Sequence, residues 1–222
     1  MSFVCRSLVF LFSASLLRSG IAPAQVPAPS STPAKRDEPM VDVAVVCPTI
    51  SIELRYSTAR NLTGAPLYPA NARCLVRQSV AARLQRAQTR LLAAGFSLKI
   101  WDAYRPAWVQ YLLWEAVRNP EFVGDPARGG SHHTRGVAVD VTLVDMMGQE
   151  AKMPTDFDDF TPAAKRKYAG ADPVVATNLK LLQETMAAVG FRGLRDEWWH
   201  FVAEDAAHYA PVELPLGAEI KP

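Results

Sequence analysis

Residues 137–144 read Val-Ala-Val-Asp-Val-Thr-Leu-Val, a nearly unbroken run of apolar and β-branched side chains. A run of this length and composition predicts a strand buried on both faces, at the centre of a sheet. Gly136 comes directly before it and allows the chain to bend away from the strand. Asp140 is the one charged residue in the run. The strand that organises the fold therefore also carries a candidate functional group.

Further elements are predicted on both sides of this strand. Apolar residues at helical spacing predict helices over residues 79–94, 108–118 and 178–188. Apolar runs and alternation predict extended segments over residues 43–46, 50–56, 96–101 and 198–203. Residues 57–76 and 145–173 are rich in turn formers and are expected to form long loops. Strands and helices are mixed without regular βαβ spacing, which predicts an α+β fold with helices packed on a small antiparallel sheet.

The composition excludes several classes of protein. Hydrophobic residues make up 49% of the 222 residues and charged residues 21%, which is typical of a globular protein and not of a disordered or multi-span membrane protein. A formal net charge of +2 argues against a strongly basic nucleic-acid-binding protein. Three cysteines are too few for a disulfide-dense scaffold. Whether Cys47 and Cys74 form a disulfide is left open, because sequence gives no geometry.

The first 40 residues are predicted to precede the folded domain, which is expected over residues 41–222. Residues 1–24 combine a basic residue, a short apolar stretch and an Ala-Pro-Ala sequence, which predicts a signal peptide cleaved near Ala24. The apolar stretch is well short of the roughly 20 residues of a membrane span, although an uncleaved anchor is the alternative. Residues 25–40 are rich in proline and serine, which predicts a flexible linker. We therefore expect an exported, periplasmic protein with no membrane span in the mature chain.

Two clusters have the residue types of a metal site. His133 and Asp140 flank the start of the central strand, and Glu197 and His200 lie three residues apart. Residues seven apart on one strand point to opposite faces, so His133 is expected in the loop before Gly136 and Asp140 on the strand. Catalytic zinc takes three His or carboxylate ligands and leaves one position for water, so His133, Asp140 and His200 form a candidate set beside a free Glu197. The alternative is surface histidines, or core histidines with satisfied hydrogen bonds.

Together the clusters resemble the D-alanyl-D-alanine dipeptidases, the VanX-type zinc peptidases of vancomycin resistance and D-alanine salvage. The family pattern S-x-H-x-x-G-x-A-x-D is matched by residues 131–140, and E-x-W-H by residues 197–200. The pattern W-D-x-Y-R-P is matched by residues 101–106, L-R-Y-x-T-x-x-N-x-T-G by residues 54–64, and F-D by residues 157–158. Five motifs in the family's order make the resemblance specific.

The resemblance implies catalytic roles for five residues. One Zn²⁺ per chain would be bound by His133, Asp140 and His200. Glu197 would act as general base toward the zinc-activated water, and Arg105 would stabilise the oxyanion. Arg105 is permanently charged and follows the predicted strand 96–101, a rigid position that suits this role.

The resemblance also implies a substrate and a fold. Tyr56, Tyr68, Ser131 and Asp158 would lie around the dipeptide, with Asp158 on its ammonium group. The fold would be the compact α+β domain shared with zinc D,D-carboxypeptidases and Hedgehog-type domains. The implied reaction is hydrolysis of D-alanyl-D-alanine to two D-alanines, for cell-wall dipeptide salvage or turnover, or for glycopeptide resistance. Two alternatives stay open: a zinc D,D- or L,D-carboxypeptidase acting on peptidoglycan stem peptides, and a non-catalytic wall-binding module.

Overall fold

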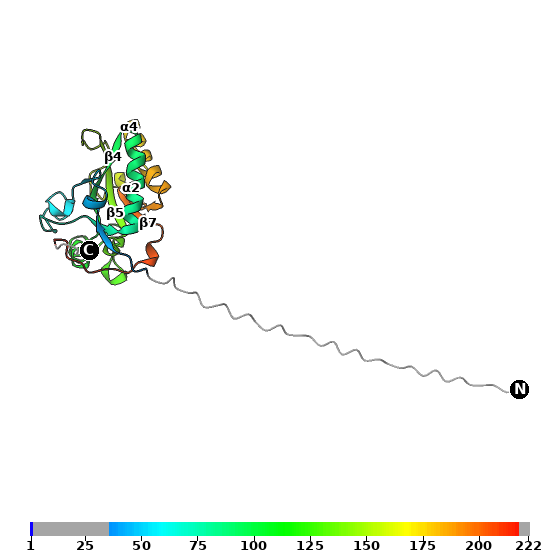
Figure 1. The fold of residues 1–222 in the computed structure, drawn as a ribbon. Helices are drawn as coiled ribbons and strands as arrows, with labels where there is room; N and C mark the ends of the chain where they lie inside the picture. Colours follow the sequence, from blue (N-terminus) through cyan, green and yellow to red (C-terminus); the bar gives the residue numbers. More distant parts are fainter. Residues whose placement is uncertain (2–35, 218–222) are drawn as a thin grey trace. The chain divides into compact units, whose positions relative to one another are not determined.

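The computed structural model of the protein describes Met1 and residues 36–217 (Figure 1). Apart from Met1, the predicted signal peptide and residues 25–35 of the predicted linker lie outside the described residues. Within the described part of the chain, no helix has both the length and the apolar character needed to cross a lipid bilayer.

The folded region begins earlier in the chain than the sequence indicates. Arg36 forms a 2.6 Å ion pair with Asp205. Met40 is buried in the first strand, β1 (Met40–Asp42). Residues 36–40, which were predicted to belong to the flexible linker, are therefore part of the domain that was expected to follow them.

Five strands form the main sheet of the described residues, in the order β2-β4-β5-β7-β6. Figure 1 labels the three strands at its centre, β4, β5 and β7. Their bounds are β2 (Ser51–Ile52), β4 (Phe96–Asp102), β5 (Ala138–Asp145), β6 (Phe191–Gly193) and β7 (His200–Ala203). β5 pairs antiparallel with β4 on one side and with β7 on the other, while β2 joins β4 in parallel. The central strand predicted from residues 137–144 is confirmed, because residues 138–144 of β5 are all buried.

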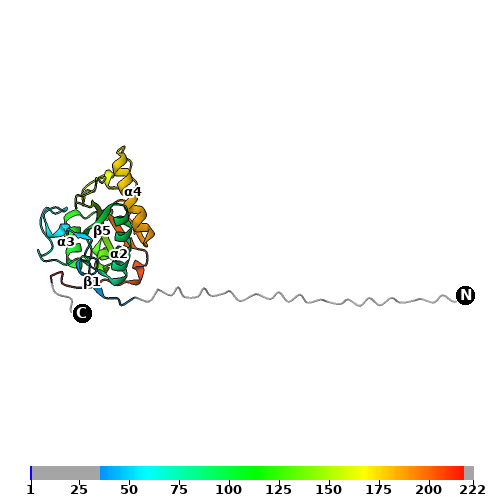
Figure 2. The ribbon, with the colours of Figure 1, turned by 45° about the horizontal axis from the view of Figure 1, so that its top comes forward.

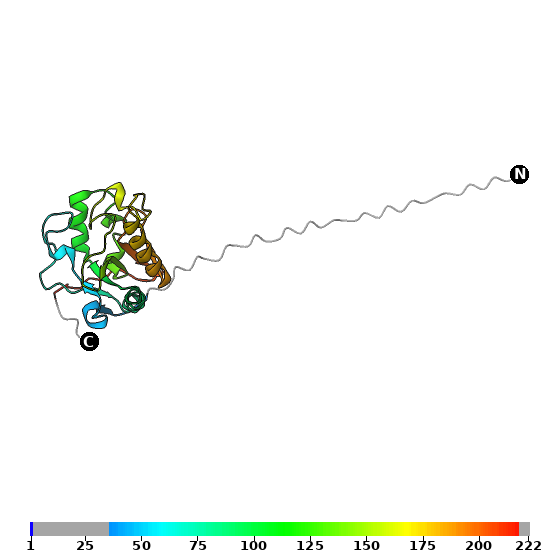
Figure 3. The same cartoon turned by 90° about the horizontal axis from the view of Figure 1, so that it is seen from above.

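Two helices cover the sheet. α2 (Gln78–Ala93) and α4 (Pro173–Ala188) contact each other and pack on the strands, α2 against β4 and α4 against β6. They lie side by side in Figure 3, and α3 (Ala107–Val117) lies apart from them (Figures 2 and 3). Leu84 and Leu91, two turns apart in α2, are both buried, as helical spacing predicts. The predicted α+β class is confirmed.

The three predicted helices are confirmed, and the largest shift is at the start of α4. This helix begins at Pro173, where the sequence indicated Asn178. The Asp172 carboxylate caps the helix by accepting a hydrogen bond from the N–H of Val174 at 2.8 Å. Proline in the first turn has no N–H that would need a partner. The start of α4 is therefore determined by this cap and not by the apolar periodicity that begins further along.

A second, two-stranded sheet lies near the start of the domain, where β1 pairs antiparallel with β3 (Leu75–Arg77). Residues 43–46 directly follow β1 and form a short helix, α1 (Val43–Val46), so the predicted extended segment is wrong. Asp42 caps this helix, and its carboxylate accepts from the N–H of Ala44 at 3.0 Å. The cap favours a helical turn over the β propensity of three valines.

The segment 50–56, also predicted to be extended, is a strand only at β2. Residues Arg55–Ser57 form one turn of 3-10 helix, η1. This turn carries Tyr56, a predicted site residue, which is buried. Cys47 and Cys74 are both free and buried, so they form no disulfide. Burial raises the pKa of each of these thiols above its ordinary value.

Replacing Leu84 should destabilise the fold, because its side chain is 0% exposed between α2 and the sheet. We expect Leu84→Ala to lower the free energy of unfolding by about 2–5 kcal/mol through lost burial and a residual cavity. Leu92→Ala is the matched control on the same helix, since Leu92 is 39% exposed, and it should cost less than about 1 kcal/mol. Urea unfolding followed by tryptophan fluorescence measures both values. Equal losses would contradict this packing.

Candidate active site

The three predicted metal ligands come together at one edge of the central strand. Asp140 on β5 and His200 on β7 are register partners in the antiparallel pair. The Nδ1 atom of His200 lies 2.9 Å from Oδ1 of Asp140. The Nε2 atom of His133 lies 3.2 Å from Nδ1 of His200 and 3.3 Å from Oδ2 of Asp140. All three side chains are buried, and their ligand atoms lie within 4.8 Å of one another.

A turn of 3-10 helix, η3 (His132–Arg135), holds His133 in place. Ser131 caps this turn, with its Oγ accepting from the N–H of His133 at 3.2 Å. Gly136 ends the turn at a φ of 68°, in the left-handed region that favours glycine. The Nδ1 atom of His133 donates to the carbonyl oxygen of Ala103 at 2.6 Å, which leaves Nε2 free to bind a metal. The predicted loop before the strand is this turn.

The donor set fits a divalent metal ion. With Nδ1 of His133 donating to a carbonyl, Nε2 of the neutral ring is an acceptor, and it faces Nδ1 of His200 and the Asp140 carboxylate. Burial opposes the charge on Asp140, but the two histidines lower its pKa below the ordinary range. Burial lowers the pKa of His200. A carboxylate and two imidazole nitrogens that converge in this way form the donor set of catalytic zinc sites.

Arg105 follows β4, and hydrogen bonds from its three side-chain nitrogens hold the guanidinium in place. Its Nε and Nη2 donate to Oδ2 of Asp102 at 2.9 and 2.7 Å, and Nη1 donates to Oε1 of Gln110 at 2.9 Å. A guanidinium has five N–H groups, so one on each terminal nitrogen has no hydrogen bond among the described residues, although Nη2 also forms an ion pair with Oδ2 of Asp140 at 3.6 Å. Burial lowers the pKa of Arg105, but the nearby Tyr56 and Asp102 outweigh it and raise the pKa. Arg105 can therefore present two positively charged donors in a fixed orientation.

Asp102 and Gln110 were not identified from the sequence as site residues. Asp102 is fully buried at the end of β4, and its Oδ2 also lies 3.5 Å from Nδ1 of His133. It therefore contacts both Arg105 and a candidate metal ligand. The signal that could have found it is a carboxylate at the end of an apolar strand, inside the W-D-x-Y-R-P motif. Gln110 lies on α3 and carries no comparable signal.

Glu197 lies beside the ligand group, in the turn that leads into β7. Its Oε2 atom is 3.9 Å from Nδ1 of His200, and its side chain lines the cavity described below. Burial raises the pKa of Glu197 well above its ordinary value, and the charges of Asp140 and Asp158 raise it further. A carboxylate with a raised pKa is suited to accept a proton near neutral pH.

One cavity of about 440 Å³ connects most of the predicted site residues. Those that line it are Tyr56, Arg105, Ser131, His133, Asp140, Asp158, Glu197 and His200. Tyr68 is not among the lining residues that the structure describes. Its hydroxyl is buried and donates to Oδ1 of Asp102 at 2.7 Å. The structure thus places Tyr68 against Asp102, where it supports the orientation of Arg105.

Asp158 is a half-buried carboxylate in the wall of the same cavity. Its Oδ1 accepts from the Tyr56 hydroxyl at 3.3 Å, and its Oδ2 accepts from the N–H of Leu62 at 3.0 Å. Burial raises the pKa of Asp158 to about 7. Both hydrogen-bond donors are neutral, so a positively charged group that entered the cavity could pair with this carboxylate.

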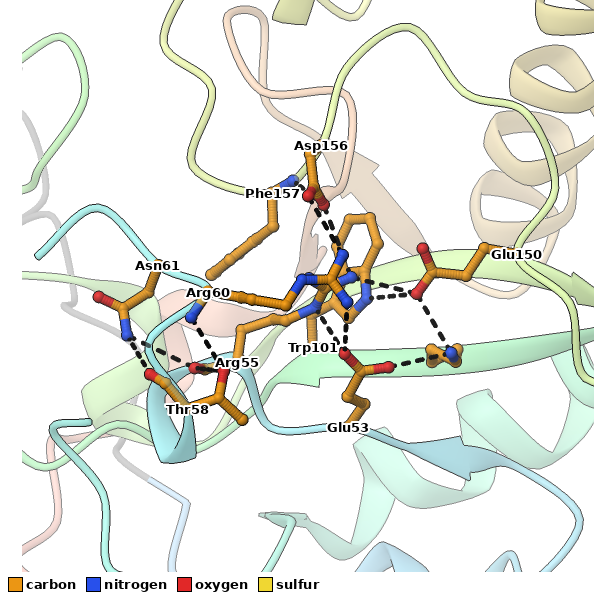
Figure 4. Close-up of polar contacts among 10 residues, drawn as sticks. Glu53, Arg55, Thr58, Arg60, Asn61, Trp101, Glu150, Asp156 and Phe157 are labelled. Carbon is orange, nitrogen blue, oxygen red and sulfur yellow. Dashed lines mark hydrogen bonds and ion pairs between the residues drawn. The ribbon is translucent and has the colours of Figure 1, made fainter. Parts of the chain in front are cut away.

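A charged cluster joins the segment that contains Arg55, next to Tyr56, to the segment that contains Asp156, two residues before Asp158 (Figure 4). At its centre is Arg55, which is 0% exposed and lies over the ring of Trp101 with 4.8 Å between the guanidinium carbon and the ring centroid. Arg55 forms ion pairs of 3.1, 3.1 and 3.5 Å with Glu53, Glu150 and Asp156. Because Arg55 belongs to η1 and binds Glu150 and Asp156, its side chain ties η1 to the segment 150–156.

Comparison with known proteins identifies the family. Residues 36–214 match the M15 peptidase family model described as D-ala-D-ala dipeptidase. The D-alanyl-D-alanine dipeptidase of Escherichia coli (strain K12) is 38% identical over 183 residues, covering 82% of this chain and 94% of the relative. That of Streptomyces coelicolor is 32% identical over 178 residues, covering 70% and 87%.

Among solved structures, a vancomycin resistance D,D-pentapeptidase in complex with Zn(II) is 16% identical. The similarity covers 60% of this chain and 76% of that chain, with a TM-score of 0.41. The sequence matches cover most of the chain and confirm the resemblance seen in the motifs. The chain belongs to the D-alanyl-D-alanine dipeptidase family of M15 peptidases.

Proposed function

We propose that this peptidase hydrolyses the dipeptide D-alanyl-D-alanine to two D-alanines and uses one Zn²⁺ per chain. The observation that carries the proposal is one cavity lined by a His-Asp-His donor group, the buried Glu197 and the half-buried Asp158. His133, Asp140 and His200 would hold the zinc, which when bound would polarise the scissile carbonyl and lower the pKa of a water.

The proton transfers are assigned to Glu197. Its carboxylate takes a proton from the attacking water and returns it to the nitrogen of the departing D-alanine. Its position, with Oε2 3.9 Å from His200 Nδ1, places it next to the proposed ligand group. Its raised pKa makes it a stronger base than an exposed glutamate.

Arg105 is proposed to stabilise the negative charge that develops on the carbonyl oxygen. Asp102 and Gln110 hold the guanidinium before the substrate arrives, so no reorganisation is needed during the reaction. The free N–H groups would then donate to the oxyanion. Asp102 and Gln110 act by positioning Arg105 and do not themselves contact the substrate in this proposal.

Asp158 is proposed to bind the ammonium group of the dipeptide, assisted by the neighbouring Tyr56. A dipeptidase must recognise a free amino end, and a half-buried carboxylate hydrogen-bonded by neutral donors is suited to that task. A carboxypeptidase acting on longer peptides has no need of such a group. This difference is the basis for preferring the dipeptide over a stem peptide.

We also propose that the protein is exported to the periplasm and acts in salvage or turnover of cell-wall dipeptide, or in glycopeptide resistance. The support is the sequence of residues 1–24, which resembles a signal peptide and lies, apart from Met1, outside the described residues.

Glu197→Gln should keep its zinc and lose activity by about a hundredfold or more, because Gln is nearly isosteric but cannot accept the proton. His200→Ala is the matched variant that removes a proposed ligand, so it should lose both metal and activity. Elemental analysis for zinc, combined with steady-state hydrolysis of D-Ala-D-Ala, separates the two effects. Near-normal turnover in Glu197→Gln would reject the base, and full zinc occupancy in His200→Ala would reject the ligand set.

Acetylation of the amino group of D-Ala-D-Ala should lower kcat/KM by about a hundredfold or more, because it removes the cation that would pair with the half-buried Asp158 and adds bulk at the same point. Asp158→Asn should remove most of this preference and slow hydrolysis of the free dipeptide. Asp159→Asn is the neighbouring control, since Asp159 is not among the described residues that line the cavity. If the wild-type enzyme cleaves acetylated dipeptide or a stem pentapeptide as fast as D-Ala-D-Ala, the carboxypeptidase alternative is correct.

Signal-peptide cleavage should leave a mature chain that begins near Gln25. Intact-mass spectrometry of the protein recovered from the periplasmic fraction measures this end directly. Recovery of the full-length chain alone, in the cytoplasmic fraction, would overturn the proposed localisation without affecting the proposed reaction.

A further inference from the structure

Two stacked phenylalanine rings form part of the cavity wall. Phe122 and Phe160 lie with their ring centroids 4.7 Å apart and their planes at 17°. Both side chains line the cavity that contains Asp158 and Glu197. One ring comes from the turn after α3 and the other from the loop after Asp158, so the stack joins two segments that are distant in the sequence. The reaction proposed above assigns it no role.

The turn that carries Phe122 is held firmly. Its backbone N–H donates to the carbonyl oxygen of Asn119 at 3.1 Å, and the next residue, Val123, is buried. Gln110 donates from Nε2 to the carbonyl oxygen of Gly124 at 2.8 Å. Because Gln110 also binds Arg105, this turn is attached to the same support as the proposed oxyanion donor.

The loop that carries Phe160 is held at both ends. Before it, Phe157 is buried in the core. After it, the N–H of Trp198 donates to the carbonyl oxygen of Ala164 at 2.9 Å, which attaches the loop to the turn that contains Glu197. Each of the two stacked rings therefore lies on a segment that other contacts hold in place. Removing the rings should enlarge the cavity and leave the proposed catalytic groups close to their present positions.

We propose that the stack of Phe122 on Phe160 is a specificity-determining barrier that excludes peptides extended beyond the dipeptide at the amino end. The inference rests on the proposed function, in which Asp158 binds the substrate ammonium. A peptide with one more residue must continue from that point, and Phe160 lies two residues after Asp158. The rings offer no hydrogen-bond partner to an added peptide group, so an extended substrate would meet both a steric block and an unsatisfied amide.

The test compares binding of D-Ala-D-Ala and of L-Lys-D-Ala-D-Ala to zinc-loaded protein by titration calorimetry. The parent protein carries Glu197→Gln, so that neither peptide is hydrolysed during the measurement. In this background, Phe122→Ala with Phe160→Ala should raise the affinity for the tripeptide by about tenfold or more. The affinity for D-Ala-D-Ala should stay close to that of the parent. Trp108→Ala is the control, because Trp108 is an aromatic residue of α3 that is 52% exposed.

An unchanged tripeptide affinity in the double variant, with normal dipeptide binding, would overturn the inference. An equal loss of affinity for both peptides would also overturn it, since the stack would then only support the cavity. If the double variant does not fold, Phe122→Ala alone carries the same test, because Val123 and Gln110 still hold its turn. Failure of the proposed function looks different: the parent protein would bind the tripeptide at least as tightly as the dipeptide.

Discussion

The register of β5 between its two neighbours is the constraint on which the site depends. Asp140 is paired with Asp102 across the β4–β5 ladder and with His200 across the β5–β7 ladder. Asp102, Asp140 and His200 therefore form a polar row across three strands. If β4 or β7 were shifted by one residue against β5, Asp102 or His200 would turn to the opposite face of the sheet. Residues 138–144 of β5 are buried on both faces of the sheet, so such a slip would also exchange the core side chains that pack on each face. The packing of the core thereby fixes the geometry of the polar row.

Buried charge is the second organising feature, and it appears at two places in the fold. Asp102 binds Arg105, which lines the cavity, and three carboxylates surround Arg55 beside Trp101. Burying such groups is costly, and each is compensated by close partners of opposite charge. Compensated buried charges add little net stability, but they hold side chains and loops in one orientation. The fold in this way supplies rigid supports for groups that must not move during catalysis.

Sequence reasoning worked where a feature is local. The central strand, the buried face of α2 and the bend before Asp140 follow from periodicity and a glycine, and the structure has all three. It failed at residues 43–46, where the capping carboxylate of Asp42 outweighs the β propensity of valine. It had no means of pairing Tyr68 with Asp102, or Phe122 with Phe160, because those contacts depend on how distant loops pack. A motif indicates which residues matter, but not which of them touch the cavity.

The order of the strands along the chain has a consequence for synthesis on the ribosome. Among the described strands β7 is the last to be made, yet it lies beside β5, in the interior of the sheet. A nascent chain that ends before Glu197 would have one apolar edge of β5 unpaired, the kind of surface on which chains aggregate. It would also have only His133 and Asp140 of the donor group, too few to retain zinc. The proposed donor group is therefore complete only once β7 has been made and has paired with β5.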